Sequence, residues 1–172
     1  GAQNNTIQDN VINLASGGAN YQNSIAVFST SSSSQTNGAL AATATSGTNS
    51  NNKVYGNTIS NVAFGIYTIC EPITATITES GNDIGGTSAG TGNTITYGVN
   101  TAADFTWTRF STTSGGIVQR NGAGNNASYN TVSTIPTLTV ASVGMNISSG
   151  SAPTGVTYTS TMSNNTVTMN NT

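Results

Sequence analysis

One short phrase built around asparagine recurs along the chain, and it constrains the fold more than any other feature. In its fullest copy, residues 51–66, single apolar residues recur at Val54, Ile59, Val62 and Ile66, and asparagine and glycine fill the intervals. No stripe of helical period can be drawn through them. Very short strands separated by corners produce such a pattern, because asparagine and glycine tolerate the backbone conformations that sharp turns require.

The phrase returns in weaker form at residues 4–12, 92–95, 125–132 and 164–167. We align the last copy by its beginning, which makes Asn170 its second asparagine. The second asparagines then recur at intervals of roughly 36 to 47 residues, within the range of repeat arrays. The pattern predicts stacked coils joined by loops of unequal length.

A second phrase alternates with the first. Its copies are short apolar runs that mostly contain or follow glycine, at residues 24–28, 64–69, 115–118 and 143–147. Each predicts a strand with alternate residues directed inward. We expect insertions in the serine-rich run after Phe28 and at 81–92 and 150–155.

The composition agrees with an all-β chain that has an uncharged polar surface. Only 5% of the residues are charged, histidine is absent, and the basic residues are Lys53, Arg109 and Arg120. Three basic residues give no footprint for a phosphate backbone, so a nucleic-acid partner is excluded, and no apolar run is long enough for a membrane span. Low charge also permits stacking, because like charges directly opposite each other on neighbouring strands repel.

The aligned phrases resemble those of right-handed parallel β-helix repeat proteins, in particular the Asn- and Thr-rich type found in large bacterial surface proteins. This resemblance implies one β-solenoid domain over residues 1–172, as a repeat unit or a segment of a longer assembly. A β-sandwich with a strand exchanged between subunits is the alternative. The resemblance also implies amide ladders at equivalent corners, formed by Asn5, Asn10, Asn52, Asn57, Asn93, Asn125, Asn130 and Asn165.

No catalytic, cofactor or metal site is predicted. Glu71, Glu79 and Asp83 lie close together in sequence, but Glu71 precedes a proline and Asp83 is typical of a turn. The aromatic run around Trp107 is interpreted as a lid on the core or an interface anchor. Cys70 is interpreted as a small buried residue. Thr-x-Thr pairs recur along the chain and are capable of binding ice on a flat face, but their irregular spacing does not predict one array.

Two classes of function follow. The first is a structural extracellular or cell-surface protein, a filament unit or a module of a stalk or adhesin, whose partner is another copy of itself. The second is a module that binds extracellular carbohydrate or ice. For the first class we expect the last coil of one unit to pair with the first coil of the next, since both ends of the chain lie within a phrase. The expected contact residues are Gly1, Gln3, Asn5, Val167, Met169 and Asn171.

Overall fold

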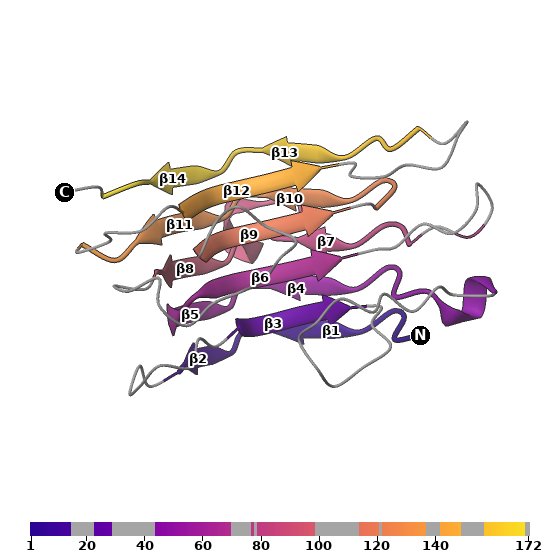
Figure 1. The fold of residues 1–172 in the computed structure, drawn as a ribbon, viewed down its shortest axis with the longest axis horizontal. Helices are drawn as coiled ribbons and strands as arrows, with labels where there is room; N and C mark the ends of the chain where they lie inside the picture. Colours follow the sequence, from indigo (N-terminus) through magenta and orange to yellow (C-terminus); the bar gives the residue numbers. More distant parts are fainter. Residues whose placement is uncertain are drawn as a thin grey trace.

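The fold is all-β, with short parallel strands stacked in three sheets (Figure 1). The computed structural model describes residues 1–14, 23–28, 44–69, 77, 79–98, 114–120, 122–136, 142–148 and 157–170. Besides strands these residues form two single turns of 3₁₀ helix, η1 (Thr45–Gly47) and η2 (Ala89–Thr91), and no α-helix.

Each sheet contains every third strand among the residues that the structure describes. Sheet A has the order β1 (Thr6–Gln8), β4 (Lys53–Tyr55), β7 (Asp83–Ile84), β10 (Asn126–Ser128) and β13 (Thr161–Ser163). Sheet B has the order β2 (Val11–Asn13), β5 (Thr58–Val62), β8 (Thr94–Tyr97), β11 (Thr131–Thr134) and β14 (Thr166–Thr168). Sheet C has the order β3 (Asn23–Phe28), β6 (Phe64–Ile69), β9 (Ser114–Arg120) and β12 (Ser142–Ser148).

One strand from each sheet, taken in chain order, makes one coil. Coils one to four are β1 to β3, β4 to β6, β7 to β9 and β10 to β12, and coil five contributes β13 and β14. Figure 1 shows the coils as successive layers, with the first and last coils at opposite ends of the stack. The arrangement is solenoid-like. The alternative of a β-sandwich is built from antiparallel sheets, whereas every strand pair in the described residues is parallel.

The core consists of apolar columns that run through the stack, one residue from each coil. In sheet A the column is Ile7, Val54, Ile84, Ala127 and Met162. In sheet B it is Ile12, Ile59, Ile95, Val132 and Val167. Ile66 and Ile117 add a column in sheet C. The register therefore places Ile7 beside Val54 and Ile12 beside Ile59, as the repeated phrase predicts.

Glycines in sheet C allow sheet B to approach closely. A Cβ atom on Gly65 would lie 2.5 Å from Cγ2 of Ile95, and one on Gly116 would lie 2.2 Å from Cγ1 of Val132. Both distances are shorter than van der Waals contact, so neither position accepts a side chain without displacing the core. The glycine of the second phrase is thus a packing requirement, because the sheet B column fills the space that a side chain would occupy.

Two predictions from the sequence are wrong, one insertion and one alignment. Residues 81–92 are not simply an insertion, because β7 lies within them and supplies the sheet A strand of coil three. The last phrase is shifted, because Val167 pairs with Val132 and Asn165 therefore takes the place assigned to Asn170. Asn170 instead donates its backbone N–H to Oγ1 of Thr134 at 2.8 Å. The other predicted insertions, residues 150–155 and the serine-rich run after Phe28, fall outside the described residues.

Candidate functional site

The most regular polar feature of the molecule is an asparagine ladder at the corner between sheets A and B. It runs through all five coils as Asn10, Asn57, Asn93, Asn130 and Asn165. Each Nδ2 donates to Oδ1 of the next asparagine, at 2.9 to 3.1 Å. The same Oδ1 also accepts the backbone N–H of the preceding asparagine. We call this the B ladder, because each of its residues immediately precedes a sheet B strand.

The B ladder is also tied to the backbone. Nδ2 of Asn93 donates to the carbonyl oxygen of Val54 at 2.8 Å, and Nδ2 of Asn130 donates to that of Ile84 at 3.1 Å. Asn93 and Asn130 are each 1% exposed. These buried amides therefore satisfy one another and the corner carbonyls, and they avoid the cost of an unpaired buried polar group.

A second ladder, the A ladder, precedes the sheet A strands and is shorter. It contains Asn5, Asn52, Asn82 and Asn125. Asn5 and Asn52 each donate Nδ2 to the next Oδ1, whereas Asn82 reaches Asn125 through its backbone N–H alone, at 3.1 Å. Since Asn126 pairs with Thr161, the next position in coil five belongs to Ser160. The A ladder therefore ends one coil before the B ladder.

The sequence analysis missed Asn82. The signal was present, because Asn82 and Ile84 have the same spacing as Asn52 and Val54. The surrounding glycines made the segment look like a turn. All eight asparagines that were predicted belong to one of the two ladders.

The residue before each ladder asparagine makes the corner. In the A ladder these residues are Asn4, Asn51, Gly81 and Gly124, with φ between 58° and 67°. In the B ladder Asp9, Gly56, Tyr129 and Asn164 have φ between 54° and 62°. Only Gly92, which follows η2, departs, with φ of −66°. The left-handed conformation strongly favours glycine, asparagine and aspartate, so Tyr129 is the unusual member.

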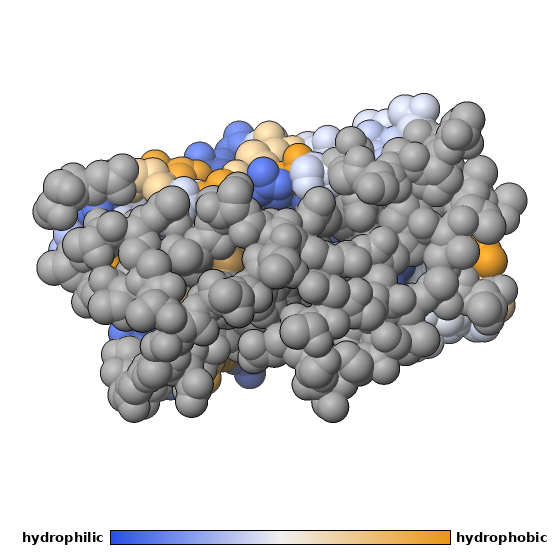
Figure 2. All heavy atoms as spheres, in the orientation of Figure 1, coloured by the Kyte–Doolittle hydropathy of each residue, from blue (hydrophilic) through white to orange (hydrophobic). Residues whose placement is uncertain are grey.

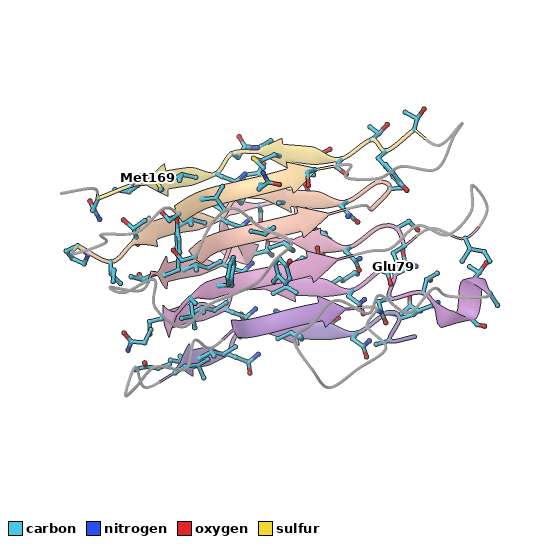
Figure 3. All side chains as sticks on the ribbon, viewed as in Figure 1. Glu79 and Met169 are labelled. Atoms are coloured by element: carbon cyan, nitrogen blue, oxygen red, sulfur yellow. The ribbon has the colours of Figure 1, made fainter. Side chains whose placement is uncertain are left out.

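In the last coil, core-column positions that are buried in the interior coils are exposed to solvent. Met162, Val167 and Met169 are 46%, 44% and 39% exposed. Figure 2 shows hydrophobic atoms along this edge of the stack, and Figure 3 shows Met169 beside β14. Met169 lies over sheet C, because its Sδ would be 3.4 Å from a Cβ atom on Gly144. Val167 and Met169, both predicted as subunit contacts, thus lie together on the open face.

Three of the other predicted contacts, Gly1, Gln3 and Asn5, lie at the first coil. The amino group of Gly1 donates to the carbonyl oxygen of Ser46 at 3.0 Å, and Nε2 of Gln3 donates to that of Thr45 at 2.7 Å. These bonds hold the amino-terminal segment against η1 of the second coil. Asn5 begins the A ladder. Asn171 lies outside the described residues.

Asp83 accepts hydrogen bonds through both of its carboxylate oxygens. Oδ1 of Asp83 accepts Nδ2 of Asn126 at 2.7 Å and the N–H of Gly86 at 3.1 Å, and Oδ2 accepts the hydroxyl of Tyr55. Burial, this hydrogen bond and the negative charge of Asp83 raise the pKa of Tyr55 to about 12, so the phenol stays neutral at physiological pH. Asp83 lies in register with Lys53. Through these hydrogen bonds Asp83 connects Tyr55, Gly86 and Asn126, which belong to three neighbouring coils.

Glu79 is the most buried carboxylate in the described part of the chain. It is 4% exposed, and its Oε1 accepts the backbone N–H of Asn49 at 3.0 Å (Figure 3). Among the described residues no group of three or more His, Cys, Asp or Glu side chains could hold a metal ion. Cys70, Glu71 and Trp107 lie outside those residues.

Among the described residues no helix has the length and apolar character needed to cross a membrane. Comparison with protein-family models, with curated protein sequences and with solved structures finds no match to this chain.

Proposed function

We propose that the chain is a right-handed parallel β-helix that serves as a structural unit, and that such units stack head to tail into a filament or a surface stalk. The right hand is favoured because connections between parallel strands of one sheet are almost always right-handed when strands carry their normal twist. Lateral partners are not required for this function. The proposal rests on the two open ends of the stack.

The direction of the B ladder is the observation that carries the proposal. In coils one to four the backbone N–H and Nδ2 of each ladder asparagine donate to Oδ1 of the next. At the first coil, Oδ1 of Asn10 accepts no hydrogen bond from the described residues. At the last coil, the backbone N–H of Asn165 has no acceptor among them, and its Nδ2 bonds only to the carbonyl oxygen of Ala127, at 2.8 Å. One end thus presents donors and the other presents an acceptor.

A second copy placed in register completes this ladder. Its Asn10 would accept the two donors of Asn165 of the first copy, which repeats the bonds already made between neighbouring coils. Val167 would then lie beside Ile12, in the same column that Val132 and Val167 occupy within one copy. Burying Val167 and Met169 at this contact stabilises it by about 25 cal/mol for each Å² of apolar surface removed from water.

Such a contact joins two different surfaces and leaves a new open coil at each end. Heterologous contacts of this kind do not close into a dimer, and when the rotation between units does not form a ring they propagate as a filament. The same joint can connect consecutive segments of one longer chain. We place the unit outside the cell because of its resemblance to Asn- and Thr-rich bacterial surface proteins and its uncharged polar surface.

Light scattering and negative-stain electron microscopy of the purified chain over a range of concentrations test the proposal. We expect particles that lengthen with concentration. The variant Val167→Lys, which puts a charge on the open column, should reduce the chain to monomers. Thr166→Lys is the matched control, because Thr166 is adjacent on the same strand and faces outward, and it should still assemble. A wild-type chain that stays monomeric at all concentrations, or two variants that behave alike, would contradict the proposal.

A further inference from the structure

Sheet B presents a column of threonines on its outer face. The register aligns Thr58, Thr94, Thr131 and Thr166, one on each of four successive strands. All four are exposed, and each precedes a residue of the core column of sheet B. These four threonines are 36, 37 and 35 residues apart along the chain, so successive coils place them at the same position of the sheet.

A second hydroxyl column lies two residues further along three of these strands. It consists of Thr96, Ser133 and Thr168, which are in register. Oγ1 of Thr96 and Oγ of Ser133 are 3.2 Å apart and share a hydrogen bond, which fixes the orientation of both. In β5 the register shifts after Ile59, so the two-column array covers β8, β11 and β14.

The array has a regular two-dimensional spacing. Neighbouring strands are about 4.8 Å apart, and residues two apart along a strand are separated by about 6.6 Å. None of the described positions in the two columns carries a charged side chain. Water oxygens on a face of hexagonal ice repeat at distances close to the strand spacing. We propose that this threonine face of sheet B binds the surface of an ice crystal.

Each threonine supplies both groups that such a surface requires. The hydroxyl anchors a water molecule by a hydrogen bond, whereas the methyl group cannot, so neighbouring waters bond to one another in an ordered layer. Val11 continues the first column into coil one and is 81% exposed. Valine has the shape of threonine with a methyl group in place of the hydroxyl. An otherwise unexplained exposed apolar residue thus extends the row of methyl groups.

Ice fits this face better than a macromolecule does. The described positions of the two columns contain no aromatic side chain for stacking on a sugar ring and no charge for an ionic partner. The array also lies within one copy of the chain. Ice binding therefore does not depend on head-to-tail stacking, although stacking would lengthen the array.

Adsorption into a slowly grown ice hemisphere and thermal hysteresis test this inference. The wild-type chain should enter the ice above the level of a globular control protein and should shape ice crystals into facets. Thr131→Lys, at the middle of the array, should lower the adsorption to the control level. Thr161→Lys places the same charge on an exposed strand position of sheet A, and it should retain the wild-type adsorption.

Far-UV circular dichroism establishes that both variants are folded. If Thr131→Lys does not fold, Thr58→Lys in coil two provides the same test. Exclusion of the wild-type chain from ice would overturn the inference, as would equal adsorption of the folded array variant and Thr161→Lys. Binding to a polysaccharide that Thr131→Lys abolishes, without ice adsorption, would assign the face to carbohydrate and would also overturn it.

Discussion

Two buried amides in neighbouring regions of the molecule have opposite environments. Asn93, at the corner between sheets A and B, is 1% exposed and bonds through its backbone N–H, its Nδ2 and its Oδ1. Gln119, in β9 of sheet C, is fully buried, and neither amide atom has a hydrogen-bond partner among the residues that the structure describes. The difference lies in the register: stacking places identical amides on both sides of Asn93, whereas the register neighbours of Gln119 are Thr68 and Ile147.

The largest effect should come from removing an interior amide of the B ladder. Asn93→Leu leaves the backbone N–H of Asn57 without its acceptor in a buried corner, and it removes one of the two hydrogen bonds made by Nδ2 of Asn57 and one of the two accepted by the carbonyl oxygen of Val54. We expect a loss of about 4 kcal/mol in the free energy of unfolding, measured by chemical denaturation. Asn146→Leu, at an exposed strand position of β12, is the control and should change it by less than about 0.5 kcal/mol. Similar losses in both variants would show that the ladder does not stabilise the fold.

At Gln119 we expect a substitution to raise the free energy of unfolding and not to lower it. Gln119→Leu replaces an unpaired buried amide with an apolar side chain of similar size, and it should raise the free energy of unfolding by about 1 to 3 kcal/mol. The exposed Gln8→Leu should leave it nearly unchanged. Destabilisation by Gln119→Leu would mean that the amide has a partner in solution.

Position along the ladder sharpens the comparison further. Asn10 is exposed at the first coil, and its Nδ2 donates to Asn57 and to the carbonyl oxygen of Gln8. Asn10→Ala should cost only about 1 kcal/mol, because water replaces the lost partner. Asn93→Ala, measured in parallel, should cost several times more. Equal costs at the two positions would show that burial does not determine the strength of the ladder.

The smallest effect concerns the backbone of the corner rather than its amide. Tyr129 occupies the left-handed region with φ of 61°. Gly56 takes the equivalent position two coils earlier, with φ of 62°. Tyr129→Gly should stabilise the fold by about 0.5 to 1 kcal/mol by relieving this conformation. The reciprocal Gly56→Ala should destabilise it, since a Cβ atom there would lie 2.3 Å from Oδ1 of Asp9. A thermal melt of both variants distinguishes the two signs.

The sequence predicts the ladders wherever a copy of the phrase keeps both asparagine and the following aliphatic residue. Asn57 and Asn93 are recognisable because the residues around them are identical. Coil three was only half recognised, since a strand of two residues between glycines has too little pattern to separate from a turn. Coil five was misaligned because Ser160 replaces the A-ladder asparagine, so its only ladder residue was matched to the wrong corner.

Contacts between sheets could not be predicted from the sequence. The sequence places Gly116 in a predicted strand, but it does not indicate that Val132 packs against this glycine. The threonine face has the same origin, because loops of different length bring Thr94 and Thr131 into register. Local pattern defines the corners, whereas the lengths of the loops decide which residues meet across coils.

The spacing between ladder partners also bears on how the chain folds. Asn52 and Asn82 are 30 residues apart, whereas Asn5 and Asn52 are 47 apart. The entropy of closing a loop grows only with the logarithm of its length, so the longer closure is less favourable by only about 0.4 kcal/mol. Nucleation can therefore start between almost any two neighbouring coils and spread in both directions. Pulse-labelling hydrogen exchange should show backbone amides of several coils gaining protection together, and strictly sequential protection from one end would exclude this.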